Sequence, residues 1–242
     1  MKQGFYTVSE NTPLTQSVYR MQLVGDTDGI KCGQFINILI DSLYLRRPIS
    51  VCDVSDQSIT ILYKVVGKGT EKMACMPIGA RLDVLTQLGN GYDTAPSGDK
   101  VLLLGGGVGV PPLYLLCKKL IAEGKAVTVI LGFNTKDEIF YEQEFKDLGA
   151  TVFVTTADGS YGVKGFVTDA MKSLDYTYFY TCGPEPMLKA IDKTAVTSGQ
   201  LSFEERMGCG FGACMGCSCK TKYGNKRICK DGPVLEREEI IW

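Results

Sequence analysis

The sequence predicts an N-terminal antiparallel β-barrel, then a doubly wound parallel-sheet domain, then a small C-terminal cysteine module. Three observations support this class. Residues 1–97 hold short stretches of alternating polar and apolar residues with turn residues between them. Residues 98–205 alternate apolar strand-like runs with helix-like stretches, and residues 206–242 hold five of the ten cysteines. We therefore predict three domains, with boundaries after residues 97 and 205.

Composition excludes several classes of protein. A chain of 242 residues exceeds the usual size of one domain, and its net charge of −1 offers no basic surface for nucleic acid or anionic lipid. The absence of histidine excludes His-based acid–base catalysis, His-ligated zinc and a Rieske centre. The N-terminus lacks a secretory apolar segment, and glycines and prolines interrupt the apolar stretch 101–117. We therefore expect a cytoplasmic protein.

In the first domain, alternation predicts strands over 17–23, 34–40 and 58–65. Short strands at this close spacing are typical of an antiparallel barrel or sandwich. The turn-rich segment 90–98 is a plausible linker. Four cysteines among apolar neighbours are expected to be small buried side chains: Cys32, Cys52, Cys75 and Cys117.

The second domain has a regular alternation of strands and helices that predicts a parallel sheet with helices on both faces. The predicted strands are 101–104, 127–131, 151–155, 176–180 and 201–204, and the predicted helices are 111–122, 137–148, 166–174 and 184–196.

The cysteines of the third domain have metal-ligand spacing. Cys209, Cys214 and Cys217 form C-x4-C-x2-C, and Cys229 follows after eleven intervening residues, which is the plant-type 2Fe–2S pattern. Interleaved glycines leave backbone N–H groups free to point at sulfur. Cys219 is an alternative to Cys217 as the third ligand. Zinc and redox-active thiols are the alternative readings, although zinc sites usually show a second closely spaced pair.

A glycine loop follows the first strand of the second domain. Gly105, Gly106, Gly107 and Gly109 precede a helix that starts at Pro111, and a helix N-terminus of this kind can bind a pyrophosphate. The loop does not fit G-x-G-x-x-G, and the next strand ends without the usual ribose carboxylate. A tight strand–helix turn that binds nothing is the alternative.

Four further features of the sequence are each compatible with ligand binding or with a purely structural role. Residues 181–187 follow the fourth strand and form a ligand-facing rim or a helix cap. Arg46 and Arg47 are phosphate-binding guanidiniums or a solvated pair. Tyr63 is a core residue or a surface on which a ring stacks, and residues 67–70 form a turn whose N–H groups suit phosphate.

Together these motifs resemble a known family. R-P-I-S in the barrel, G-G-G-x-G-x-x-P and C-G-P-x-P-M in the second domain are the pattern of ferredoxin–NADP reductase-like flavoproteins. The run E-R-M-G-C-G-F-G-A-C-M-G-C at 205–217 is similar to the electron-transfer subunits of type B, NAD-linked dihydroorotate dehydrogenases. The resemblance spans the whole chain.

The resemblance implies FAD, NAD and a 2Fe–2S cluster as cofactors. Arg47 would hold the FAD pyrophosphate and Ser50 would lie near the reactive edge of the isoalloxazine, while Cys182 would face the nicotinamide. NAD is favoured over NADP because only Lys136 is available for a 2′-phosphate. The implied contacts are Arg47, Pro48, Ile49, Ser50, Leu62, Tyr63, Lys64, Gly69 and Thr70 for FAD, Gly105, Gly106, Gly107, Gly109 and Cys182 for NAD, and Cys209, Cys214, Cys217 and Cys229 for the cluster.

The resemblance also implies a function in de novo pyrimidine biosynthesis. A partner subunit with FMN would oxidise dihydroorotate, and electrons would pass through the cluster and FAD to NAD⁺, in a heterotetramer with two copies of each subunit. No catalytic acid–base residue is predicted, since the cofactors supply the chemistry. The alternatives are a small subunit of an NAD(P)H–ferredoxin transhydrogenase or sulfide dehydrogenase, and, from another class, a zinc-binding regulatory module.

Overall fold

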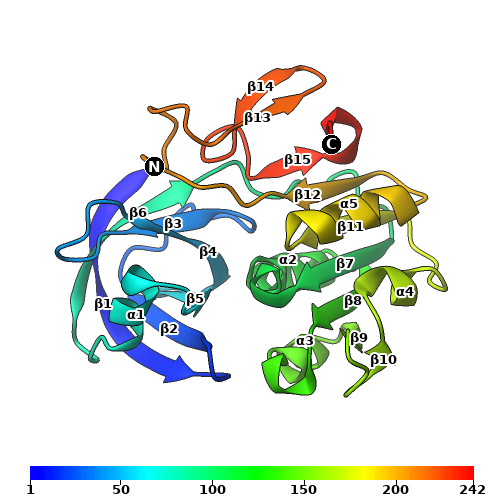
Figure 1. Cartoon of the computed structure of the whole chain (residues 1–242), viewed down its shortest axis with the longest axis horizontal. Helices are drawn as coiled ribbons and strands as arrows, with labels where there is room; N and C mark the ends of the chain where they lie inside the picture. Colours follow the sequence, from blue (N-terminus) through cyan, green and yellow to red (C-terminus); the bar gives the residue numbers. More distant parts are fainter.

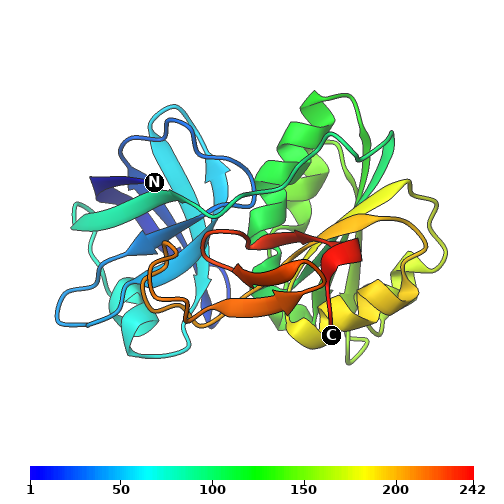
Figure 2. The ribbon, with the colours of Figure 1, turned by 90° about the horizontal axis from the view of Figure 1, so that it is seen from above.

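The computed structural model describes residues 1–242. Figure 1 shows a barrel at the N-terminal end of the chain, an α/β lobe beside it, and a small cysteine module that lies along the top of both. Figure 2, seen from above, shows the module lying across the junction of the two lobes. The predicted fold class, a barrel followed by a doubly wound domain and a cysteine module, is confirmed.

The barrel closes in the order β1-β2-β5-β4-β3-β6. Alternate residues of β3 and β5, among them Ile36, Ile38, Ile59 and Ile61, are fully buried in its interior. Three of its strands fall on the three stretches predicted by alternation. The strands are β1 (Lys2–Pro13), β2 (Val18–Val24), β3 (Phe35–Ile38), β4 (Arg47–Val54), β5 (Ser58–Lys64) and β6 (Arg81–Leu88).

The barrel contains one helix where the sequence suggested only a turn. Helix α1 (Lys68–Ala74) starts inside the segment 67–70, because the Thr70 hydroxyl accepts hydrogen bonds from the backbone N–H of Val66 and Gly67 and so organises the first turn. Cys75 follows at the end of this helix and is exposed, so its expected burial is wrong.

The second lobe holds a seven-stranded sheet in the order β10-β9-β8-β7-β11-β12-β15. The five predicted strands are parallel neighbours, and β15 of the cysteine module adds an antiparallel strand to one edge. The strands are β7 (Lys100–Gly106), β8 (Ala126–Phe133), β9 (Thr151–Thr156), β10 (Val163–Lys164), β11 (Tyr178–Cys182), β12 (Gly199–Ser202) and β15 (Val234–Glu236).

Helices cover both faces of this sheet. Helices α2 (Pro111–Ala122) and α3 (Glu142–Asp147) pack on the face toward the barrel, and α4 (Val167–Met171) and α5 (Glu185–Thr194) pack on the other face (Figure 1). The predicted helix 137–148 is interrupted, because Tyr141 adopts a left-handed conformation with φ of 66°. It divides into a short 3-10 turn, η2 (Lys136–Glu138), and α3.

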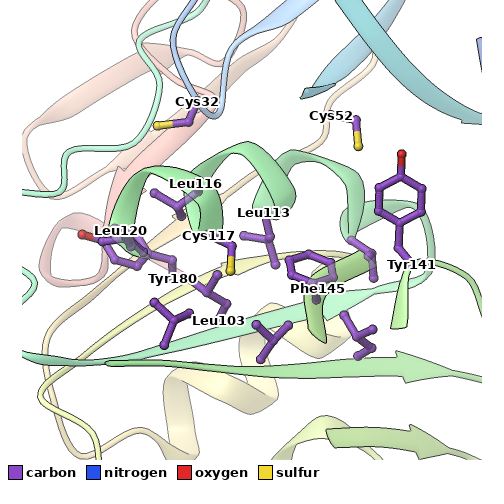
Figure 3. Packing of buried hydrophobic residues seen from close by; sticks show 14 of the residues in the cluster. Cys32, Cys52, Leu103, Leu113, Leu116, Cys117, Leu120, Tyr141, Phe145 and Tyr180 are labelled. Atoms are coloured by element: carbon purple, nitrogen blue, oxygen red, sulfur yellow. The ribbon is translucent and has the colours of Figure 1, made fainter. Parts of the chain in front are cut away.

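A continuous apolar cluster joins the two lobes. Barrel residues Cys32 and Cys52 pack with Leu113, Leu116 and Cys117 of α2 in one buried cluster (Figure 3). Three of the four cysteines expected to be buried therefore lie here. Because α2 is buried between the barrel and the sheet, the glycine turn that precedes it is held against the barrel.

The cysteine module consists of a loop, a hairpin and β15. Strands β13 (Ser218–Thr221) and β14 (Gly224–Arg227) form the hairpin, and a 3-10 turn, η3 (Arg237–Glu239), follows β15. The linker between the lobes is hydrogen-bonded to the cysteine module. Asn90 Nδ2 donates to the Val234 carbonyl at 2.7 Å, and Asn90 Oδ1 accepts from the Val234 N–H at 3.2 Å. None of the helices is long and apolar enough to span a membrane.

Candidate cofactor sites and cysteine loop

The start of β4 differs from the rest of the barrel in its burial. Arg47, Pro48, Ile49 and Ser50 are all half-buried, whereas Val51, the next residue, is fully buried. Pro48 and Ser50 face the same side as their β3 partners across the ladder, which point away from the barrel interior. This stretch therefore offers a partly open surface on a rigid strand, which fits a flat cofactor.

The two adjacent arginines have different environments. Arg46 forms an ion pair with Asp83 at 3.0 Å and also donates to two backbone carbonyls, so it braces β3 against β6. Arg47 has no carboxylate partner and donates to the Leu45 carbonyl. Its guanidinium lies against α1 at Gly69, where an added Cβ would be well under 3.0 Å from it. Of the two, Arg47 is the one available to a phosphate.

Strand β5 presents its three predicted FAD residues on two faces, with Tyr63 on the inner face and Leu62 and Lys64 on the outer one. Tyr63 is a core residue, 2% exposed, and its hydroxyl donates to Asn11 Oδ1 at 2.9 Å. Leu62 faces the cluster between the lobes, and Lys64 lines a small cavity together with Gly107 and Val108. Contact between Tyr63 and a flavin would therefore involve backbone rather than the aromatic ring.

Most glycines of the turn lie where the backbone is too closely packed for a side chain. Gly105, Gly106 and Gly109 are buried, and an added Cβ at Gly109 would lie well under 3.0 Å from the Cys182 carbonyl group. Only Gly107 borders open space. The turn and the 182–187 segment are thus in direct backbone contact, which brings together two motifs that lie far apart in the sequence.

Cys182 lies at the carboxyl end of β11. Its ladder partners are Gly105 of β7 on one side and Ser202 of β12 on the other. Burial raises the pKa of the Cys182 thiol to about 12, so the group stays protonated at neutral pH. A neutral thiol at the carboxyl edge of a parallel sheet suits van der Waals contact with the face of a bound ring.

Sequence reasoning missed an acid at the end of β8. Glu138 folds back through the η2 turn, and its carboxylate accepts from the Asn134 N–H at 3.1 Å and from Asn134 Nδ2 at 2.9 Å. It lines the same small cavity as Gly107. A carboxylate therefore reaches the end of β8 from five residues beyond the strand. Lys136, the candidate for a 2′-phosphate, is exposed.

The four predicted cluster ligands form two pairs in the structure. In one pair, Cys209 Sγ accepts from the N–H groups of Ala213 at 3.2 Å and Cys214 at 3.4 Å, while Cys214 Sγ accepts from the Cys209 N–H at 3.5 Å. In the other, Cys217 Sγ accepts from the Cys229 N–H at 3.4 Å. Cys219 lies on β13 and takes part in none of these contacts.

The two cysteine pairs differ in their electrostatics, since the pKa of Cys209 is lowered and that of Cys229 is raised. Although burial opposes it, N–H donors of Phe211, Cys214 and Ala213 lower the pKa of Cys209 to about 6. Burial and the neighbouring Cys217 raise the pKa of Cys229 to about 12, which reflects thiols crowded together. No three or more candidate ligand side chains are arranged to hold one metal ion. Two pairs with N–H donors fit a binuclear, negatively charged cluster better.

Comparison with known proteins agrees with this arrangement. Residues 204–241 match the family model of the iron–sulfur cluster binding domain of dihydroorotate dehydrogenase B, and residues 103–193 match that of the oxidoreductase NAD-binding domain. A solved structure of an NADH-dependent reduced ferredoxin–NADP oxidoreductase, a flavin-based bifurcating enzyme, superposes with a TM-score of 0.90 at 29% identity and covers 99% of this chain and 90% of that one.

Curated relatives match over nearly their full length. The electron transfer subunit of dihydroorotate dehydrogenase B (NAD(+)) from Shouchella clausii is 42% identical over 99% of this chain and 98% of its own. The subunit of the same name from Fusobacterium nucleatum is 44% identical over 97% and 96%. The predicted flavin, iron–sulfur and NAD chemistry is confirmed by these matches. The chain belongs to the family of electron transfer subunits of NAD-linked dihydroorotate dehydrogenase B.

Proposed function

We propose that this chain carries electrons from a partner subunit that oxidises dihydroorotate to orotate, as part of de novo pyrimidine biosynthesis. Dihydroorotate loses two electrons and two protons, NAD⁺ takes both electrons and one proton, and the second proton is released. Bound FAD exchanges a hydride with nicotinamide and single electrons with an iron–sulfur cluster. The observation that carries the proposal is the full-length similarity, above 40%, to relatives of that name.

In this proposal the barrel holds FAD. Arg47 binds the pyrophosphate as a bidentate donor, because it alone of the two arginines lacks a carboxylate partner. Ser50 lies beside the reactive edge of the ring, and the half-buried surface of β4 carries its face. The Thr70 hydroxyl accepts from the N–H groups of Val66 and Gly67, so the N–H groups offered to phosphate are those of the first turn of α1, which begins at Lys68. The full set is Arg47, Pro48, Ile49, Ser50, Leu62, Tyr63, Lys64, Gly69 and Thr70.

The sheet lobe holds NAD at the carboxyl ends of its strands. Gly107 is the open position of the turn at which a phosphate reaches the backbone, while Gly105, Gly106 and Gly109 set the shape of that turn. Cys182 faces the nicotinamide. Glu138 accepts a hydrogen bond from a ribose hydroxyl and repels a 2′-phosphate, which supports NAD over NADP.

The cysteine loop holds the 2Fe–2S cluster. Cys209 and Cys214 bind one iron, and Cys217 and Cys229 bind the other, as their pairing through N–H···S contacts suggests. Cys219 binds neither iron. The glycine-rich loop is exposed at Phe211 and Met215, so it presents little covering between the cluster and a docked subunit.

The partner in this proposal is an FMN-containing dihydroorotate dehydrogenase subunit, in a complex of two copies of each chain. The complex works in the cytoplasm, which the ten unpaired cysteines support, since a reducing compartment keeps thiols free.

Co-expression with such a partner tests the function. The expected result is co-purification and dihydroorotate-dependent reduction of NAD⁺ that requires both chains. Iron and flavin analysis of the same sample separates this result from a zinc-binding regulatory module, which would contain zinc and no flavin. A complex that holds all cofactors but reduces no NAD⁺ with dihydroorotate would contradict the proposal.

A second candidate is a small subunit of an NAD(P)H–ferredoxin transhydrogenase. The bifurcating ferredoxin–NADP oxidoreductase superposes over nearly the whole chain, although its identity is lower than that of the curated relatives. An activity assay with reduced ferredoxin in place of dihydroorotate as the electron donor distinguishes the two functions. The same assay with sulfide as the donor tests for a sulfide dehydrogenase.

A further inference from the structure

Asn37 is a buried amide at the junction of the barrel and the cysteine module. It lies on β3 and is 1% exposed, between Ile36 and Ile38, which both point into the barrel interior. Asn37 therefore points to the outer face of the strand. Its partner across the ladder is Pro48 of β4, on the strand that we assign to the flavin, so the two side chains share that outer face.

The cysteine loop closes directly onto this amide. Asn37 Nδ2 donates a hydrogen bond to the Cys209 carbonyl at 3.3 Å across 172 residues of sequence. The next residue, Gly210, has φ of +77°, and an added Cβ there would lie well under 3.0 Å from Nδ2. The loop can approach this closely only because Gly210 has no side chain.

The backbone of Asn37 is fixed as well. Arg46 donates to the Asn37 carbonyl at 3.3 Å, while its ion pair with Asp83 anchors the guanidinium to β6. Asn37 Oδ1 is buried without a hydrogen-bond partner in the chain. An unsatisfied buried acceptor costs about 1–3 kcal/mol, which offsets the gain from the hydrogen bond that Nδ2 donates to the Cys209 carbonyl. Stability alone does not explain an asparagine at this position.

We propose that Asn37 is a positioning residue that sets the cysteine loop at a fixed distance and orientation from the flavin strand. This inference rests on the proposed assignment of β4 to FAD and of the loop to the cluster. The step it governs moves one electron between the two cofactors, breaks no bond and needs no further reactant. Asn37 touches neither the nicotinamide nor the substrate of the partner.

Asn37→Leu and Asn37→Asp in the full, cofactor-loaded chain test this role. Both variants keep the shape of the side chain and remove the N–H donor. With NADH in a stopped-flow experiment, flavin bleaching should keep its rate, and reduction of the cluster should slow several-fold. The paramagnetic resonance spectrum of the reduced cluster should also change. At a pH where its carboxyl is ionised, Asn37→Asp should in addition lower the cluster's midpoint potential, since it then places a negative charge beside an anionic centre.

The matched control is Gln34→Met. Gln34 is a buried amide just before β3 that donates to the Gly89 carbonyl at 2.9 Å and makes no hydrogen bond to the cysteine loop. Its replacement should lower the melting temperature and leave cluster reduction and the cluster spectrum as in the wild type. An equal effect of Gln34→Met on the cluster would mean a general loss of packing and would overturn the positioning role.

Wild-type cluster reduction and spectrum in both Asn37 variants would also overturn the inference and leave the cofactor assignments intact. A wild-type chain without iron would instead overturn the proposed function itself. If Asn37→Leu does not fold, Gly210→Ala displaces the loop from the opposite side of the same contact. It should slow cluster reduction in the same way, and an unchanged rate in that variant would contradict the proposal.

Discussion

Two glycine-rich segments of this chain have similar compositions but different structural roles. In the segment 105–109 the glycines are mostly buried, and they remove side chains where backbone packs against backbone at Cys182. In the segment 208–216 the chain is largely exposed, and the backbone folds around sulfur with N–H groups directed at Cys209 and Cys214. In our proposal the first segment therefore shapes the NAD site and the second surrounds the cluster ligands, which predicts different consequences of substitution.

The largest effect is expected from the cysteine loop. Cys214→Ser should remove the cluster and with it all electron transfer to the partner, because one of the two proposed iron-binding pairs is broken. NADH oxidation with an artificial acceptor should remain, since the flavin and NAD sites lie elsewhere. Iron analysis and both activity assays check this.

Cys219→Ser is the matched control for that experiment, because this thiol takes no part in the N–H···S contacts. It should retain iron and both activities. Loss of iron from Cys219→Ser, with retention in Cys217→Ser, would move the third ligand to Cys219.

Arg47→Ala should weaken FAD binding by about 1.5–3 kcal/mol, or roughly 10- to 150-fold, since one charge-assisted phosphate contact is lost. FAD content after dialysis measures it. Arg46→Ala should instead lower the free energy of unfolding, because Arg46 braces β3 through Asp83. FAD retained by Arg47→Ala and lost by Arg46→Ala would reverse the two roles.

Within the glycine turn, Gly109→Ala should lower the free energy of unfolding by about 1–3 kcal/mol, because the new methyl meets the Cys182 backbone, which cannot rotate away. Gly107→Ala meets open space and should cost about 1 kcal/mol from its positive φ alone, while raising the KM for NADH. Denaturant unfolding of both variants tests the contrast, and equal losses would contradict the packing role of Gly109.

The smallest effect concerns Glu138. Glu138→Gln removes a negative charge near the expected 2′-phosphate position, so the preference for NADH over NADPH should fall by about fivefold to tenfold, or roughly 1 kcal/mol. The ratio of kcat/KM for the two nucleotides measures it, with Asp137→Asn as the neighbouring control. An unchanged ratio would show that Glu138 only caps the η2 turn.

Local patterns predicted much of this molecule. Helix 111–122 matches α2 at both ends, because Pro111 marks the first turn and the apolar run defines the core. The x4/x2 spacing singled out Cys209, Cys214 and Cys217 as ligand candidates, and the N–H···S contacts of Cys209 are local in the same way. The α/β strands were predicted because parallel strands buried on both faces are continuously apolar.

The remaining features depend on contacts that sequence patterns do not contain. Glu138 reaches the end of β8 through the short η2 turn, which ends at the extended Ile139 in place of the expected continuous helix, and nothing in the alternation shows this. Asn37 was visible as a polar residue on the outer side of a strand, but the loop that covers it lies 172 residues away. The antiparallel pairing of β15 with β12 likewise depends on tertiary contacts that a local pattern does not show.

The most direct test of the central claim is an anaerobic titration of the purified chain with NADH, followed by absorption and paramagnetic resonance. The account predicts that the flavin and the iron–sulfur absorption both bleach, with full reduction at about 1.5 NADH per chain, since FAD takes two electrons and the cluster one. A reduced-cluster resonance of about one spin per chain should appear. A flavin that bleaches while the iron stays oxidised, or a chain without iron, would contradict the account.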